Sequence, residues 1–153
     1  MEVRYRSASI EDLEFLVESR LAFIHLSNSD SDYEWIRGNI RAYFEKGIRE
    51  NQCDIILAER DSAIIGTGIV FYYDSVPSMF NPLGKNAYIT SMYVNEAYRR
   101  QGIATTILGR LMSIAKAKNY RVFLLQPSEI GKPLYEKHGF FEGEKGMLYK
   151  ENT

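Results

Sequence analysis

The sequence predicts one α+β domain over residues 1–153, with a mixed, mostly antiparallel central sheet of six to seven strands flanked by about four helices. Three observations support this fold class. Runs rich in β-forming residues alternate with amphipathic helical stripes along the chain. Only the polar residues Arg60, Asp61 and Ser62 separate two of these runs, which is typical of an antiparallel hairpin. A long helical stripe connects two later runs, so we expect those strands to be parallel.

The first part of the chain is expected to hold a short strand and two helices. The strand covers residues 3–6. Ser9 and Asp12 form a capping-box pattern before apolar residues at helical spacing, which predicts a helix over about residues 10–25. The polar run at 27–30 ends it. A second apolar stripe with a similar capping pattern predicts another helix that ends near Glu50.

The rest of the chain is expected to complete the sheet. The hairpin pairs strands 54–59 and 63–73, and a loop with two prolines follows. The later elements are strand 86–94, a helix around residues 103–115, strand 121–125, a short helix over about 128–137 that Gly139 ends, and two last strands near 140–142 and 147–150.

Composition narrows the classes of function. Nineteen basic and twenty acidic residues give a formal charge of -1, so no broad attraction to nucleic acid or to an anionic membrane is expected. No signal-peptide pattern is found, and no apolar run approaches the roughly 20 residues that span a bilayer, so we expect a cytoplasmic protein. The sequence has a single cysteine, Cys53, and two histidines, so we predict neither an internal disulfide nor a metal site.

Any anion site must therefore be local, and one segment, residues 99–105, has the features for it. The segment leads directly from a β run into a helix, whose first N–H groups are unpaired and carry partial positive charge. Gly102 and Ala104 leave room for a phosphate there. Arg99 and Arg100 add positive charge, and Thr105 adds a hydroxyl donor. We therefore predict that this loop binds a pyrophosphate.

Two motifs resemble those of one family. Arg99-x-x-Gly102-x-Ala104 after a strand is similar to the acetyl-CoA loop of the GNAT N-acetyltransferase superfamily. The segment 131–140 is similar to the family's C-terminal segment, a short helix that carries a tyrosine and is closed by Gly-Phe. The order of the expected elements also matches, so the resemblance extends over nearly the whole chain.

The resemblance implies a GNAT-like acyl-CoA acyltransferase fold and an enzyme that transfers the acetyl group of acetyl-CoA to an amine by direct attack in a ternary complex. Acetyl-CoA would lie between strands 86–94 and 121–125, which splay apart in this family. Tyr135 would be the general acid toward the departing thiolate. The residues implied in cofactor binding are Met92, Tyr93, Val94, Arg99, Arg100, Gln101, Gly102, Ile103, Ala104 and Thr105.

The sequence leaves several alternatives open. Tyr88 stands where some family members place a base glutamate, so a water relay, Tyr73 or Asp74 would have to assist deprotonation. The acceptor is a small-molecule or peptide amine, and an acidic aromatic rim including Asp30, Asp32 and Asp74 would suit a cationic one. A homodimer, transfer of another acyl group, a catalytically silent acyl-CoA sensor and a cofactor-free interaction domain also remain open.

Overall fold

The computed structural model describes residues 2–144 and 146–151. Its helices and strands follow the order expected from the sequence as far as residue 137. The strands are β1 (Arg4–Ser7), β2 (Cys53–Arg60), β3 (Ala63–Asp74), β4 (Lys85–Val94) and β5 (Val122–Leu125). The α-helices are α1 (Leu13–Phe23), α2 (Tyr33–Arg49), α3 (Ile103–Ala117) and α4 (Lys132–Lys137). Short 3-10 turns, Ile10–Asp12 and Glu96–Tyr98, precede α1 and α3.

The five strands form one mixed sheet in the order β1-β2-β3-β4-β5. Neighbouring strands are antiparallel except β4 and β5, which are parallel because α3 carries the chain back across the sheet. The predicted hairpin and the predicted parallel pair are therefore both confirmed. The capping box of Ser9 and Asp12 is also present, at the start of the turn that leads into α1.

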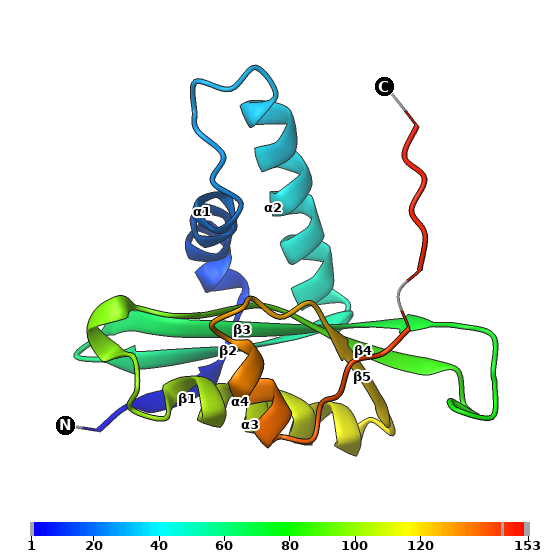
Figure 1. Ribbon diagram of the computed structural model, residues 1–153. Coiled ribbons are helices and arrows are strands. Elements are labelled where there is room, and N and C mark those ends of the chain that lie inside the picture. Colours follow the sequence, from blue (N-terminus) through cyan, green and yellow to red (C-terminus); the bar gives the residue numbers. More distant parts are fainter. Residues whose placement is uncertain (1, 145, 152–153) are drawn as a thin grey trace.

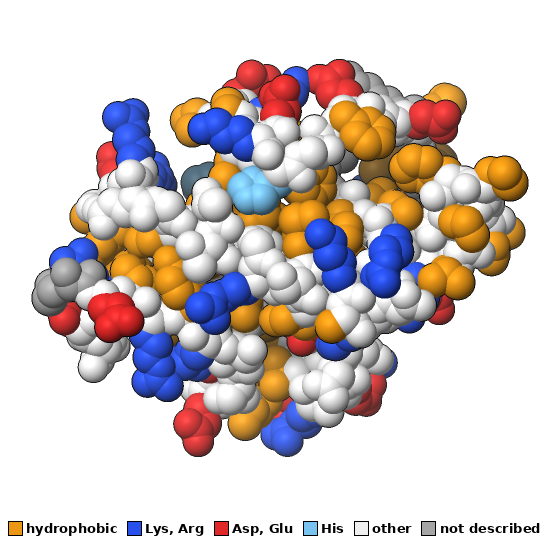
Figure 2. Space-filling view, turned by 90° about the horizontal axis from the view of Figure 1, so that it is seen from below, with side chains coloured by type: hydrophobic (Ala, Val, Ile, Leu, Met, Phe, Trp, Pro, Cys, Tyr) orange, Lys and Arg blue, Asp and Glu red, His pale blue; other side chains and the backbone are white. Residues whose placement is uncertain are grey.

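Helices cover both faces of the sheet (Figure 1). α1 and α2 lie on one face, over a core that includes Leu16, Phe44 and Leu57. α3 and α4 lie on the other face, where Ile107 and Leu111 are fully buried against the strands. Figure 2 views the molecule from this second side, on which charged side chains of both signs are interspersed with apolar and neutral ones. No helix among the described residues is long and apolar enough to cross a membrane.

The expected number of six to seven strands is wrong for the part of the chain that the structure describes, which has five. Residues 140–142 and 147–150 have no regular secondary structure, and the C-terminal segment runs away from the sheet (Figure 1). Their apolar residues are suited to a strand, but a strand also needs a hydrogen-bonded neighbour. Met147, Leu148 and Tyr149 are instead 87–104% exposed.

Candidate active site

A β-bulge interrupts β4 near its end. Thr67 of β3 pairs with Tyr93 and Ile69 pairs with Thr90, so Ser91 and Met92 together lie opposite Gly68 alone. Ser91 has a φ of 53°, in the left-handed region that non-glycine residues rarely adopt. The facing strand has a glycine here, and a Cβ at Gly68 would lie 2.5 Å from Cγ2 of Ile107 on α3 and 2.6 Å from the Met92 Sδ. Such a bulge bends its strand and re-aims the residues that follow.

β4 and β5 separate just where this bulge begins. Their pairing runs from Asn86 with Val122 to Ile89 with Leu125 and goes no further. Beyond that point lies a cavity of about 410 Å³. It is lined by Arg20, Phe23, Tyr88, Ile89, Thr90, Ser91, Met92, Leu125, Gln126, Pro127, Ser128 and Tyr135. The cavity thus brings the bulged end of β4 together with the tyrosine that the sequence singled out.

Tyr135 reaches the cavity from α4, on the opposite side of the sheet from α1. Its ring packs edge-on against Phe140, with 5.9 Å between the ring centroids, and the residue is only 9% exposed. Burial raises the pKa of the Tyr135 phenol, because the charged phenolate is poorly solvated there. The phenol therefore keeps its proton at neutral pH, as a proton donor must.

The loop before α3 has the shape of an anion site. Arg100 and Gly102 both have positive φ, 64° and 79°, and Gly102 is the N-cap residue of α3. No atom lies within 4 Å of the place that a Cβ on Gly102 would take, so the approach to the helix start is open. Arg99 is fixed by a 3.0 Å hydrogen bond from its Nε to the Val94 carbonyl. These features fit a pyrophosphate on the first N–H groups of α3.

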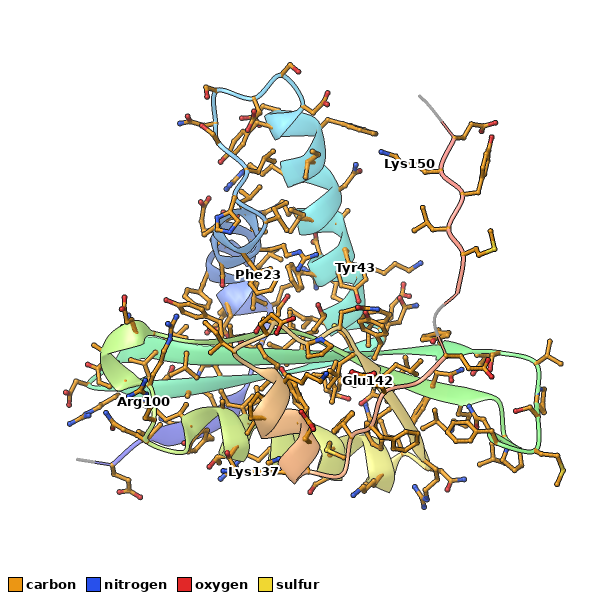
Figure 3. All side chains as sticks on the ribbon, in the orientation of Figure 1. Phe23, Tyr43, Arg100, Lys137, Glu142 and Lys150 are labelled. Carbon is orange, nitrogen blue, oxygen red and sulfur yellow. The ribbon has the colours of Figure 1, made fainter. Side chains whose placement is uncertain are left out.

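The remaining residues of the loop differ in what they offer. Ile103 is buried and anchors the helix start in the core, whereas Gln101 and Thr105 are exposed. The hydroxyl of Thr106 is already used, because it donates to the Gly102 carbonyl at 3.0 Å. Figure 3 labels Arg100 in the loop and Phe23 on the α1–α2 side of the sheet. Thr105 is the hydroxyl that stays available to a ligand.

A second cavity, of about 440 Å³, lies beyond the ring of Tyr88. It is lined by Tyr43, Asn51, Gln52, Phe71, Tyr72, Tyr73, Asp74 and Tyr120. Phe71 lines this cavity and Tyr88 lines the first one. Their rings stack with 5.0 Å between centroids, so the walls of the two cavities are in contact. Tyr73 and Asp74, the sequence-based candidates for assisting deprotonation, line this cavity and do not line the one with Tyr135.

The expected acidic rim does not gather in one place. Asp30 accepts a 2.8 Å hydrogen bond from the backbone N–H of Ser27, in the connection between α1 and α2. Asp32 is the N-cap residue of α2 in the same connection. That connection lies far from the end of β3, where Asp74 is found (Figure 1). Asp74 with Tyr72 and Tyr73 is the part of the rim that the structure brings together.

Sequence reasoning missed Arg20, Phe23 and Ser91. One signal for Arg20 was available, because it follows Leu16 by four residues and Val17 by three, which places a charge beside the buried stripe of α1. Ser91 gave no signal, since the residues around it do not predict a β-bulge. Cys53, by contrast, is buried between α2 and the sheet, and burial raises the pKa of its thiol to about 11. Within the described residues no three metal-ligating side chains form a cluster.

Comparison with known proteins identifies the family. Residues 20–140 match the model of the acetyltransferase (GNAT) family. A solved structure of a predicted acetyltransferase with acetyl-CoA from Clostridium acetobutylicum is 28% identical, with a TM-score of 0.87 over 97% of this chain and 96% of that one. A GCN5-related N-acetyltransferase from Ralstonia eutropha is 20% identical, with a TM-score of 0.85 over 97% and 99%.

A third similar structure is glucosamine-6-phosphate N-acetyltransferase from Arabidopsis thaliana, which is 22% identical, with a TM-score of 0.73 over 99% of this chain and 100% of that one. No curated protein gives a significant match. The chain belongs to the GNAT acetyltransferase family. It is an acetyltransferase that uses acetyl-CoA.

Proposed function

We propose that this enzyme acetylates an amine by direct attack on acetyl-CoA within one ternary complex, in the cavity between β4 and β5. The observation that carries the proposal is the convergence of three features on this end of the sheet. They are the bulged end of β4, the open start of α3 at Gly102 and the buried phenol of Tyr135. Each supplies a different part of an acyl transfer.

The cofactor half of the site, residues 92–94 and 99–105, has two tasks. Residues Arg99 to Thr105 hold the pyrophosphate through the N–H groups of α3 and the arginine charges. The backbone of Met92, Tyr93 and Val94 pairs with the pantetheine arm, because β4 has no partner on its β5 side beyond Ile89. Fixed N–H donors on this edge also stabilise negative charge that develops on the carbonyl oxygen during the reaction.

Bound acetyl-CoA supplies an acetyl group activated as a thioester. The amine nitrogen forms a bond to the carbonyl carbon as the bond from that carbon to sulfur breaks. Tyr135, which burial keeps protonated at neutral pH, gives its proton to the departing sulfur, and the phenolate then regains a proton from water. No aspartate or glutamate is among the described residues that line the cavity, so the amine loses its proton to water.

Two measurements on the wild-type protein test this function. Acetyl-CoA should raise the melting temperature, because a ligand at 100 times its Kd stabilises the folded state by about 2.7 kcal/mol. Release of free CoA should then depend on an added amine. Binding without amine-dependent release would support the acyl-CoA sensor instead, and absence of binding would support the cofactor-free interaction domain. Replacing acetyl-CoA with propionyl-CoA or succinyl-CoA in the same assay tests acyl specificity.

A further inference from the structure

Of the twelve described residues that line the cavity between β4 and β5, only Arg20 is charged. It comes from the last turn of α1 and is half-buried. The rest of the lining is aromatic, aliphatic or neutral polar. A guanidinium in such a place influences any charged substrate more strongly than one on the open surface, because there is less water to screen it.

The guanidinium of Arg20 is held in position from two sides. Its Nη1 donates a 3.2 Å hydrogen bond to the hydroxyl of Ser91, at the bulge of β4. Its Cζ lies 5.3 Å from the centre of the Phe23 ring, within the range of a cation–π contact. These contacts use one of the five N–H donors of the group. The side chain is therefore oriented while most of its hydrogen-bonding capacity stays available.

Arg20 also differs from other arginines in the same helical layer in having no carboxylate partner among the described residues. Arg37 of α2 pairs with both Glu14 and Glu18 of α1, and Arg41 pairs with Glu14. The acidic residues of α1 thus face α2 and are already engaged there. Arg20 lies on the side of α1 that meets the cavity, where no carboxylate of a described residue balances its charge.

We propose that Arg20 binds an oxyanion, a carboxylate or phosphate, on the acceptor, so that the substrate class is an amine that also carries an anionic group. This inference rests on the proposed function and names the acceptor class for the same site. Arginine suits the task because its planar fork can donate two parallel hydrogen bonds to a carboxylate or phosphate. The fixed charge also disfavours a cationic acceptor such as a polyamine, and it lowers the pKa of a bound ammonium group.

Matched acceptors test the proposal. Each standard amino acid is assayed beside its amide, phosphoethanolamine beside ethanolamine, and spermidine serves as the cationic acceptor. The amino-acid pairs test a carboxylate as the oxyanion, and the phosphoethanolamine pair tests a phosphate. An amide has the less protonated amine at neutral pH, so chemical reactivity alone favours the amide. We expect at least one anionic acceptor to exceed its neutral partner in kcat/KM by about 10–100-fold, as charge-assisted hydrogen bonds commonly give.

Variants then assign the preference to Arg20. Arg20→Gln should reduce the ratio between the anionic and neutral acceptor to near one, mainly through KM, and Arg20→Lys should restore part of it. Arg41→Gln is the matched control from the same helical layer, outside the cavity, and should keep the wild-type ratio. Melting temperature and acetyl-CoA affinity, measured for every variant, report on folding. Equal use of both members of every pair by the wild type, or an unchanged ratio in Arg20→Gln, overturns the proposal.

A binding measurement separates this proposal from the acetyltransferase mechanism. The N-acetylated form of the preferred acceptor, or N-acetylglycine if no acceptor is turned over, is titrated into the CoA-loaded protein by calorimetry. Binding that Arg20→Gln weakens, without turnover of any amine, supports the oxyanion site and overturns the proposed transfer. Turnover with no preference for anionic acceptors supports the proposed acetyl transfer and overturns the oxyanion site. If neither turnover nor binding is found, both proposals fail.

Discussion

The two halves of the candidate site are built in different ways. The cofactor half comes from one continuous stretch, in which the end of β4, a short turn and the start of α3 follow one another. The acceptor half joins residues far apart in the chain, as Arg20 and Ser91 show, which touch across 71 positions. A continuous stretch keeps its geometry through local backbone conformation, whereas the acceptor half depends on how α1 packs on the sheet. The first half therefore suits a constant cosubstrate, and the second is free to vary with the acceptor.

The largest effect is expected in the cofactor half, from Gly102→Glu. The new carboxylate would occupy the open start of α3 and repel the pyrophosphate, so saturable acetyl-CoA binding should be lost in calorimetry. Gly102 has a φ of 79°, so a glutamate side chain there also costs about 1–2 kcal/mol of stability. Gly102→Asn is the matched control, since asparagine tolerates this conformation and adds no charge. Wild-type affinity in Gly102→Glu would place the cofactor elsewhere.

Tyr135→Phe tests the chemistry where the two halves meet. The variant keeps the ring that packs on Phe140 and removes the hydroxyl, so kcat should fall by roughly 10²–10⁴ while acetyl-CoA affinity stays unchanged. Tyr149→Phe, on the exposed C-terminal segment, is the control for loss of a phenol. A lower melting temperature with near-normal kcat would show that Tyr135 is only structural, and weaker acetyl-CoA binding with normal kcat would show a cofactor contact.

The same phenol predicts an alkaline limit for the enzyme. Its pKa in the folded protein lies above the ordinary value of about 10, so kcat should hold through neutral pH and decline only above that value. The preference for the protonated form also stabilises the fold below pH of about 10, and this contribution is lost as pH rises through the folded pKa. Urea unfolding at several pH values should show a smaller alkaline loss of stability in Tyr135→Phe.

The smallest effect on turnover is expected from Cys53→Ala. The thiol is buried on the α2 side, and its pKa of about 11 leaves little thiolate at neutral pH. Because the proposed mechanism has the amine attack the thioester directly, kcat should stay within about twofold of wild type. Intact mass spectrometry after incubation with acetyl-CoA alone provides the check. An acetyl group found on Cys53 would show a covalent intermediate and a two-step mechanism.

The difference between the two halves also explains what the sequence could predict. The loop at 99–104 and Tyr135 could be proposed from the sequence because each lies within a short local pattern. Arg20 and Phe23 were not, since their place in the cavity depends on packing between separate elements. The two C-terminal strands were predicted wrongly because a run such as Met147 to Tyr149 indicates compatibility with a strand, while the existence of a neighbouring strand is a tertiary property.

The bulge in β4 determines which insertions and deletions in the gene the fold can tolerate. Side chains alternate between the faces of a strand, so the extra residue at Ser91 decides that Val94 is buried and Tyr93 exposed. Deleting one codon there would exchange these faces and turn an apolar side chain out of the core. In-frame insertions in the loop between β3 and β4 change no such register. Near the proposed cofactor site, the length of β4 is thus expected to be more constrained than the identity of Ser91.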